Sequence, residues 1–326
     1  MALESYLKTQ MSSLAKGMAL LSPLARTVLG DMRSEAEMKA LAVRLGERPE
    51  VPGEHRLQDV PRALAVARSA LAALTAVEQT APQGDDPFMG LNAGAIRALI
   101  ANVADRLGWA LRQGLRDRTW GLYVLIDPEL TAGREPLAVA EAAIRGGARI
   151  LQLRDKSHDK GDLLPLASAL KDLCHANKVM FIINDDADMA RAVDADGLHV
   201  GQSDLPVEKA RLVLEPHQIL GRSNHSVEEA LESERLGVDQ IAVGAIYPTA
   251  SKEKTHGAGL EALRQVRAAV HLPIVAIGGI NADNVQPVIE AGADAVAVIS
   301  AVSLAADPEQ ASRTLVERIR KAGGRA

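Results

Sequence analysis

The sequence is poor in several informative kinds of residue. Of its 326 residues only Cys174 is a cysteine, which excludes an internal disulfide and any metal site built from several cysteines. Only 2% are aromatic although 47% are hydrophobic, so the apolar mass is Ala, Val, Leu and Ile, as in parallel sheets covered by helices. No apolar run reaches 18 residues, which argues against a transmembrane helix. The formal net charge of −5 argues against a nucleic-acid binder held by phosphate contacts.

Length and termini bound the remaining choices. A chain of 326 residues can hold one large α/β domain and a smaller one. No apolar core of a signal peptide occurs at the N-terminus, so we expect a cytoplasmic protein. Cys174 falls in a helical pattern, and we interpret it as a small buried hydrophobe.

Residues 1–118 have the periodicity of helices and no pattern typical of catalysis. Apolar residues recur at steps of three and four over 1–21, 64–77 and 96–111, and a further helix is expected over 35–45. Glu47–Gln58 and Thr80–Asn92 are rich in turn formers and are predicted to be connections, with Asp59 as the N-cap of the helix that follows. We interpret the arginines of the last helix as a solvated face and predict a helical domain over 1–118.

From residue 119 onward, short β-rich runs alternate with helical patterns. Eight such β/α units in roughly 200 residues are typical of a TIM barrel, an α/β fold that puts its chemistry at the carboxyl ends of the strands. A doubly wound sheet is the alternative, but it calls for a glycine-rich turn after the first strand, where Asp127-Pro128-Glu129 stands. The predicted strands are Gly121–Asp127, Arg149–Asp155, Met180–Asp185, Gly197–Gln202, Ile219–His225, Gln240–Pro248, Pro273–Gly279 and Ala295–Val302.

Two neighbouring strand ends each carry a carboxylate. Asp185 follows the apolar run Phe181–Ile183, and Asp204 follows the next predicted strand. If these strands are parallel neighbours, the two carboxylates converge on one patch of the rim. Oxygen ligands without Cys or His beside them suit a hard cation such as Mg²⁺. The alternative is that both residues cap the following helices.

The second predicted strand places unlike residues on its two faces. Alternation puts Gln152, Arg154 and Lys156 on one face and Leu151 and Leu153 on the other. Cations that face a barrel interior are costly unless an anion or a carboxylate meets them. The pattern therefore favours a binding site for an anionic group over a solvated surface.

Several other strand ends carry small polar residues. In the fifth strand, Ser223 is followed by His225, for which a structural hydrogen bond is commoner than acid–base chemistry, whereas His199 in the fourth strand is expected to serve packing. The stretch Tyr247–Lys252 can wrap a phosphate with hydroxyls and a lysine. Gly279, Ile299 and Ser300 stand at the ends of strands seven and eight, and the loops after these strands form the usual phosphate cradle of such barrels. Two phosphorylated substrates are implied.

Together these stretches resemble the thiamine-phosphate synthase family, in order and at family spacing from about Gly121 to the C-terminus. The resemblance implies a TIM barrel that joins a hydroxymethylpyrimidine diphosphate to a thiazole phosphate and releases pyrophosphate and thiamine phosphate. It also implies loss of pyrophosphate before the thiazole nitrogen attacks, so that no nucleophile or strong base is required. The motifs are QLRDK (Gln152–Lys156), IIND (Ile182–Asp185), GLHVGQSDLP (Gly197–Pro206), GRSNHS (Gly221–Ser226), YPTASK (Tyr247–Lys252), VAIGGI (Val275–Ile280) and VISAV (Val298–Val302).

Carried over residue by residue, the resemblance gives Mg²⁺ to Asp185 and Asp204 and charge stabilisation to Arg154, Lys156 and Lys252, with Ser223 also among the catalytic residues. The pyrimidine diphosphate would be bound by Gln152, Arg154, Lys156, Asn184, Ser223 and Lys252, and the thiazole phosphate by Thr249, Ser251, Gly279, Ile299 and Ser300. Leu153, Asp155 and Ala250 fall within the same binding segments. The partners implied are these small molecules, with a homo-oligomer left open.

The chain departs from the family pattern at a few positions. Ser251 stands where Thr is usual, Arg222 occupies a usually apolar strand position, and the loop Glu253–Gly259 lacks the usual proline. A thiazole tautomerase on the same barrel is one alternative function, but that group tends to lose the diphosphate residues that are present here. A non-catalytic phosphate-binding regulatory barrel is the other. A complete metal and diphosphate set argues against it.

Overall fold

The structure is a computed structural model that describes residues 2–27, 32–44, 60–81, 88, 92–248 and 259–326. These residues form two compact units, Met1–Leu111 and Arg112–Ala326. The predicted connection Glu47–Gln58, the predicted N-cap Asp59 and most of Thr80–Asn92 lie outside the described residues.

The first unit is helical, as the periodicity predicts. Its apolar stripes meet in one core, in which Leu14, Leu74 and Ile100 are fully buried. Most of the stability of a helix in a protein comes from packing of its apolar face, so burial of these stripes against one another stabilises the helices. The helices are α1 (Ala2–Thr27), α2 (Met32–Arg44), α3 (Val60–Thr80) and α4 (Ala93–Arg116), the last of which continues into the second unit.

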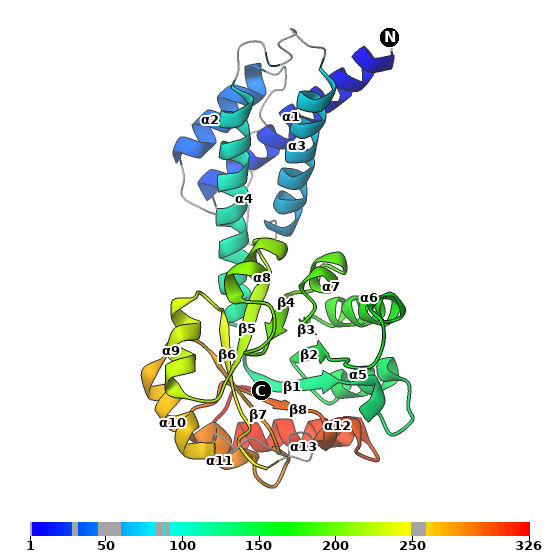
Figure 1. Cartoon of the computed structure of the whole chain (residues 1–326), viewed down its shortest axis with the longest axis vertical. Helices are drawn as coiled ribbons and strands as arrows, with labels where there is room; N and C mark the ends of the chain where they lie inside the picture. Colours follow the sequence, from blue (N-terminus) through cyan, green and yellow to red (C-terminus); the bar gives the residue numbers. More distant parts are fainter. Residues whose placement is uncertain (1, 28–31, 45–59, 82–87, 89–91, 249–258) are drawn as a thin grey trace. The chain divides into compact units, whose positions relative to one another are not determined.

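The second unit is a closed barrel of parallel strands in chain order, which confirms the predicted TIM barrel (Figure 1). Closure is made by β1 and β8, whose register pairs Tyr123 with Ala297. A doubly wound sheet would leave both edges open, so this pairing excludes that alternative. The strands are β1 (Gly121–Ile126), β2 (Ile150–Leu153), β3 (Met180–Asn184), β4 (Gly197–Val200), β5 (Ile219–Asn224), β6 (Gln240–Val243), β7 (Ile274–Ile277) and β8 (Ala295–Val298).

Most strands contribute side chains to two separate cores. Ile150 and Met180 belong to the cluster inside the barrel, whereas Leu151 and Phe181 belong to the larger cluster between strands and helices. This follows from the twofold alternation of side chains along a strand. Cys174 is fully buried in the outer cluster, as expected of a small hydrophobe.

Helices cover the outside of the barrel (Figure 1). Most follow one strand and lead to the next, which is the right-handed β/α repeat expected for parallel neighbours. They are η2 (Pro128–Leu130), α5 (Pro136–Arg145), α6 (Lys160–Ala176), α7 (Ala187–Ala192), α8 (Val207–Val213), α9 (Val227–Arg235), α10 (Gly259–Ala269), α11 (Val285–Glu290), α12 (Ser300–Ser303) and α13 (Pro308–Lys321).

Several strands end earlier than the sequence predicts. β4 stops at Val200 rather than Gln202, and β6 at Val243 rather than Pro248. Beyond Val200 the backbone leaves the ladder, because the Gly201 N–H donates to the Asp204 carboxylate at 2.7 Å. The residues after the strands therefore form turns that present polar side chains at the rim.

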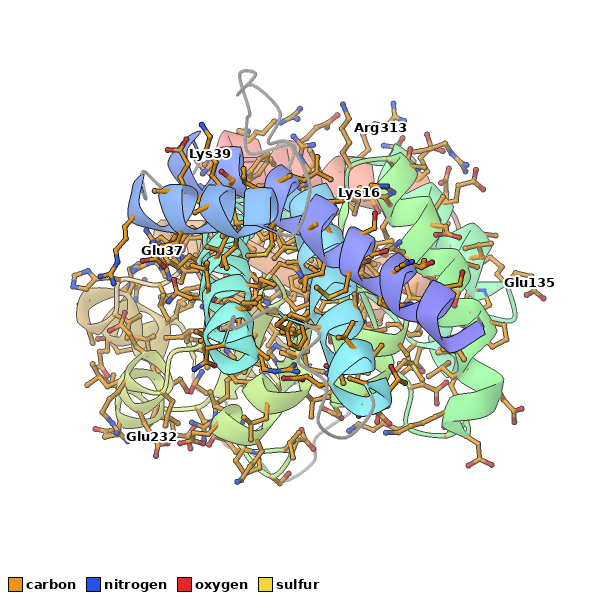
Figure 2. All side chains as sticks on the ribbon, turned by 90° about the horizontal axis from the view of Figure 1, so that it is seen from above. Lys16, Glu37, Lys39, Glu135, Glu232 and Arg313 are labelled. Carbon is orange, nitrogen blue, oxygen red and sulfur yellow. The ribbon has the colours of Figure 1, made fainter. Side chains whose placement is uncertain are left out.

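Charged side chains cover the outside of each unit (Figure 2). Those labelled on the helical unit, Lys16, Glu37 and Lys39, are exposed, and so are Glu135, Glu232 and Arg313 on the barrel unit. Within the described ranges, no helix has both the length and the apolarity needed to cross a membrane.

At the amino ends of the strands, one aspartate recurs in the same role. Asp196, Asp239 and Asp294 each precede an even-numbered strand, and each Oδ2 accepts a backbone N–H of the preceding strand at 2.8 Å. The donors are Phe181, Leu220 and Ile274. These carboxylates join pairs of strands at the face opposite the carboxyl ends, where TIM barrels keep residues that serve stability.

We predict that Asp239→Ala lowers the free energy of unfolding by about 2–3 kcal/mol, since hydrogen bonds to charged groups are worth roughly that much. Asp239 is buried and also pairs with Arg211 and with Arg112, the latter at 3.3 Å. Urea denaturation followed by circular dichroism measures the change. Asp172→Ala, an exposed aspartate on α6, is the matched control and should unfold like the parent chain. Equal denaturation of both variants would contradict this role for Asp239.

Candidate active site

Two carboxylates meet at the exits of β3 and β4. These strands are parallel neighbours, with Asn184 paired to His199 as the last pair of the ladder. The N–H of Asp185 donates to the His199 carbonyl at 2.8 Å, which fixes the backbone beside the β4 exit. Asp204 folds back onto the Gly201 N–H at 2.7 Å. The two carboxyl groups lie close enough together for each to shift the pKa of the other.

Neither carboxylate caps a helix. The N-cap of α7 is Asp186 and that of α8 is Pro206. The backbone of Asp185 has φ of 62°, in the left-handed region that costs a non-glycine residue stability and that occurs preferentially at functional sites. The geometry therefore favours the site interpretation of the pair over the capping interpretation.

The close contact separates the two pKa values. Burial raises the pKa of Asp185. The Lys156 ammonium, to which it is hydrogen-bonded, lowers that pKa, but the Asp204 carboxylate raises it again, and it stays above its ordinary value. Burial alone would raise the pKa of Asp204, but contact with Asp185, the Gly201 N–H and the Lys156 charge together outweigh burial and lower it. Two like charges this close share a proton unless a cation lies between them.

Every polar side chain on the inner face of β2 has a partner. The Gln152 amide donates to the Tyr123 hydroxyl at 2.6 Å inside the barrel, and burial raises the pKa of that hydroxyl so that it stays neutral. The Arg154 guanidinium pairs with the buried carboxylate of Asp127 at 2.5 Å. The sequence indicated that these cations need anionic partners but did not identify Asp127, which directly follows β1.

Leu153 and Asp155, which belong to the same segment, do not point their side chains into the site. The side chain of Leu153 packs in the outer cluster, so only its backbone faces the site. The Asp155 carboxylate accepts the N–H groups of Ser157 and His158 at 2.7 and 2.8 Å and shapes the loop after β2. Asn184 ends β3 beside Asp185 and is half-buried.

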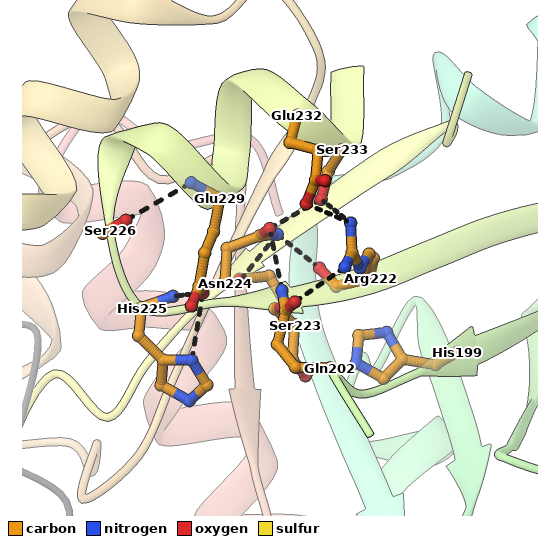
Figure 3. A network of polar contacts seen from close by, with 11 residues as sticks. His199, Gln202, Arg222, Ser223, Asn224, His225, Ser226, Glu229, Glu232 and Ser233 are labelled. Carbon is orange, nitrogen blue, oxygen red and sulfur yellow. Dashed lines mark hydrogen bonds and ion pairs between the residues drawn. The ribbon is translucent and has the colours of Figure 1, made fainter. Parts of the chain in front are cut away.

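The β5 exit places Ser223 against His199, whose Nε2 lies 2.9 Å from Ser223 Oγ. Burial lowers the pKa of His199 to about 4, so the imidazole is neutral at pH 7 and orients the hydroxyl rather than carrying charge. The nearby His225 has a structural role: its ring Nδ1 lies 3.2 Å from the Glu229 carboxylate, which also accepts the His225 backbone N–H at 2.7 Å, while Ser226 caps α9 (Figure 3).

The loops after β7 and β8 form a second part of the rim. Gly279 is exposed with φ of 66°, and a Cβ there would lie 2.8 Å from the Pro248 carbonyl, so only glycine fits. The Asn284 amide donates to the Gly279 carbonyl at 2.9 Å. Ile299 packs against the inner cluster, and the exposed Ser300 begins α12.

Arg134 fixes the position of α12. Its guanidinium donates to the carbonyls of Ser303 and Ala305 at 2.7 and 2.8 Å, just where the helix ends. This role of Arg134 is not predictable from the sequence, because an arginine in a loop has no local pattern and its partners lie about 170 residues away in the chain. The predicted phosphate residues Thr249, Ala250, Ser251 and Lys252 lie outside the described residues.

In the part of the chain that the structure describes, no cluster of three or more His, Cys, Asp and Glu side chains could hold a metal by itself. Asp185 and Asp204 nevertheless fit one hard cation, because two carboxyl groups close enough to shift each other's pKa can offer oxygen ligands to the same ion. Mg²⁺ commonly takes one or two protein carboxylates and completes its shell with water and substrate phosphates.

The chain is similar to thiamine-phosphate synthases. A model of the family described as thiamine monophosphate synthase matches residues 122–302. The thiamine-phosphate synthase of Moorella thermoacetica is 47% identical over 207 residues, 63% of this chain and 99% of the relative, and that of Natronomonas pharaonis is 45% identical over 203 residues, 61% and 95% of the two chains. The structure of a thiamine phosphate pyrophosphorylase from Pyrococcus furiosus is 37% identical with a TM-score of 0.60, covering 64% of this chain and all of that one.

We predict that Asp185→Asn raises the melting temperature of the metal-free protein at pH 7 by about 2–4 °C. The folded pKa of Asp185 lies above its unfolded value, so this carboxyl destabilises the fold once the pH has risen through the folded pKa. The asparagine removes this carboxyl and keeps an amide donor for Asp204, whose lowered pKa shows that its charge stabilises the fold. The gain should shrink at acidic pH, where Asp185 is protonated in the parent chain.

Calorimetry in the presence of a chelator measures this change. Asp188→Asn, an exposed carboxylate on α7 that pairs with Lys160, is the control and should not raise the melting temperature. A variant at position 185 that melts at or below the parent temperature at pH 7 would contradict the raised pKa of Asp185.

Proposed function

We propose, because the chain belongs to the thiamine monophosphate synthase family, that it joins a hydroxymethylpyrimidine diphosphate to a thiazole phosphate and releases pyrophosphate. Formation of thiamine phosphate is the activity of that family. The observation that carries the proposal is the convergence of two carboxylates with Lys156 and Arg154 at one rim. Cations and carboxylates together suit a diphosphate that arrives with a metal ion.

The metal proposed is Mg²⁺, held by Asp185 and Asp204. When bound, it supplies positive charge that neutralises the diphosphate oxygens as pyrophosphate leaves. The pair supports this assignment because its mutual repulsion is relieved by a cation, and because Lys156 already takes part of that role at Asp185. We expect Lys156 to turn toward the diphosphate when the metal occupies the carboxylates.

Arg154 is proposed to bind the leaving diphosphate as well. Asp127 accepts from Nη1 of the guanidinium, which has five N–H donors in all, so the remaining donors can bind phosphate oxygens. Asp127 thereby fixes the direction of the fork before substrate arrives. Lys252 is assigned to the same group through the family resemblance.

The pyrimidine ring is proposed to lie against Gln152, Asn184 and Ser223. Because Gln152 donates to Tyr123 through Nε2, its Oε1 remains as an acceptor for an amino substituent of the ring. The neutral His199 holds the Ser223 hydroxyl in one orientation. On the other part of the rim, Gly279 and Ser300 are assigned to the thiazole phosphate, where a glycine allows close approach of backbone to ligand.

The proposed reaction is dissociative. The bond between the pyrimidine methylene carbon and the bridging oxygen breaks, pyrophosphate leaves with the electron pair, and the thiazole nitrogen then donates its pair to the methylene cation. No general base is needed in these steps, which agrees with the lowered pKa of His199, a weak base, and with the contact of the His225 ring with Glu229. The residues act by charge stabilisation and by alignment of the two rings.

The direct test mixes the full chain with both phosphorylated substrates and Mg²⁺ and measures thiamine phosphate and pyrophosphate. The proposal predicts both products in equal amounts. Release of pyrophosphate from the pyrimidine substrate without any thiamine phosphate, in the presence of the thiazole phosphate, would show that the chain does not perform the coupling.

We predict that Asp185→Ala lowers turnover at least about 100-fold, comparable with the loss of a group that stabilises transition-state charge. The barrel should still fold, because this half-buried side chain lies at the rim and outside the hydrophobic clusters. Steady-state kinetics at saturating Mg²⁺ gives the rates, with circular dichroism as a check on folding. Asp188→Ala, in the first turn of α7 nearby, should retain parental turnover. Parental turnover in the folded Asp185 variant would rule out its role.

A chain shortened to begin at Arg112 is predicted to keep kcat and KM within about twofold of the full chain. Arg112 should be included, because it pairs with Asp239 and donates to the Pro216 carbonyl, both at 3.3 Å. A chain beginning at Arg118 should retain the chemistry but melt at a lower temperature. If the folded Arg112 chain binds both substrates without turning them over, residues 1–111 take part in catalysis.

A further inference from the structure

The hydrogen-bond ladder between β4 and β5 ends before it reaches Ser223 and Asp204, the residues of these two segments that belong to the site. The last pair of this ladder joins Val200 to Arg222, and β5 then continues through Ser223 and Asn224 without a backbone partner on β4. Asp204 lies beyond this point, in the turn that leaves β4. Some other interaction has to hold this turn against β5.

The side chain of Gln202 supplies that interaction (Figure 3). Its Nε2 donates to the Ser223 carbonyl at 2.6 Å and reaches Asn224 Oδ1 at 3.5 Å. One amide thus continues the connection between the two strands after their ladder ends. While Nε2 donates to β5, Oε1 of the same amide points away from β5, and this oxygen needs a hydrogen-bond donor of its own.

Arg222 is that donor. Its Nη2 donates to Gln202 Oε1 at 2.7 Å, while Nη1 lies 3.2 Å from the Glu232 carboxylate and 3.4 Å from Ser233 Oγ, both on α9. The guanidinium therefore joins the covering helix to the turn at the rim, a bridge that its rigid fork of donors suits.

The far end of this bridge is firmly anchored. Ser233 and Asn224 are buried, and Ser233 Oγ donates to Asn224 Oδ1 at 2.6 Å. The Asn224 amide in turn donates to the Arg222 carbonyl at 2.7 Å. Buried networks in which each member has partners are rigid, so the guanidinium is held in one place.

Arg222 itself does not face the substrate. Its strand neighbours Val200 and Ile241 belong to the outer cluster, so its side chain points toward the helices. An arginine here buries a charge that an apolar residue would not, and its cost is offset by the contacts with Glu232 and Gln202. This explains the departure from the apolar residue usual at this position.

We propose that Arg222 is a positioning residue for the metal site, acting through Gln202. It fixes the Gln202 amide, and the amide holds the turn Gly201–Asp204 against β5 so that Asp204 meets Asp185. The same contact orients the Ser223 carbonyl and with it the β5 exit. The inference rests on the proposed function only in taking Asp185 and Asp204 as the metal ligands.

The test measures binding of Mn²⁺, with inorganic pyrophosphate present, by electron paramagnetic resonance of the free ion. Arg222→Met is expected to raise the dissociation constant for Mn²⁺ about 10-fold or more, the range found when a partner of a metal ligand is lost. Gln202→Met should give a similar rise. The double variant should be no weaker than the weaker single variant, because both residues act through one path.

Arg211→Met is the matched control. Arg211 also donates to carbonyl oxygens, those of Gln218 and Gly237 at 2.9 and 3.0 Å, but at the amino ends of β5 and β6. Its loss should lower the melting temperature and leave the Mn²⁺ dissociation constant unchanged. A purely structural role for Arg222 would give this same result, with lower stability and parental Mn²⁺ affinity, and would overturn the proposal.

Asp204→Ala separates this inference from the proposed function. If that variant loses Mn²⁺ affinity while folded Arg222→Met keeps it, the role of Arg222 is wrong and the metal assignment stands. If Asp204→Ala binds Mn²⁺ as the parent does, the metal assignment is wrong and the inference fails with it. Should Arg222→Met fail to fold, Gln202→Met decides between these outcomes, since its amide lies at the exposed rim.

Discussion

Closure of the parallel sheet is the constraint on which the site depends. Because β1 pairs with β8, every strand has two neighbours, and all carboxyl ends point to one rim. Residues far apart in the chain therefore share one surface. Asp127 from the end of β1 reaches Arg154 after β2, and Asp185 after β3 reaches Asp204 after β4. An open sheet would leave β1 as an edge strand and would not bring this series of exits into one ring.

Aspartates have different neighbours at the two ends of the barrel. At the amino ends, each of Asp196, Asp239 and Asp294 accepts backbone N–H groups and stabilises a strand pair. At the carboxyl ends, Asp185 and Asp204 repel each other and raise the pKa of one member. The same residue type thus serves stability on one face and ligand binding on the other, and the difference lies in which groups surround each carboxylate.

Much of this arrangement could be predicted from the sequence, because it follows from local periodicity. The alternation of Gln152, Arg154 and Lys156 with leucines already indicated a polar inner face. Their partners could not be predicted: Tyr123, Asp127 and the α12 anchor Arg134 come into contact only through closure. The predicted strands also extended too far at their carboxyl ends. There, side chains such as those of Gln202 and Asp204 take the place of backbone hydrogen bonds between strands, and residue propensities do not indicate where this happens. The roles at Thr249–Lys252 stay predictions.

The central claim is that Asp185 and Asp204 hold one divalent cation between them. Crystals grown with Mn²⁺ and pyrophosphate, measured near the manganese absorption edge, test this most directly. The account predicts one anomalous peak in contact with an oxygen of each carboxylate, at about the 2.0–2.2 Å typical of small divalent ions, with the Lys156 ammonium moved from Asp185 to the pyrophosphate. A peak bound to pyrophosphate alone, with Asp185 still paired to Lys156, would contradict it.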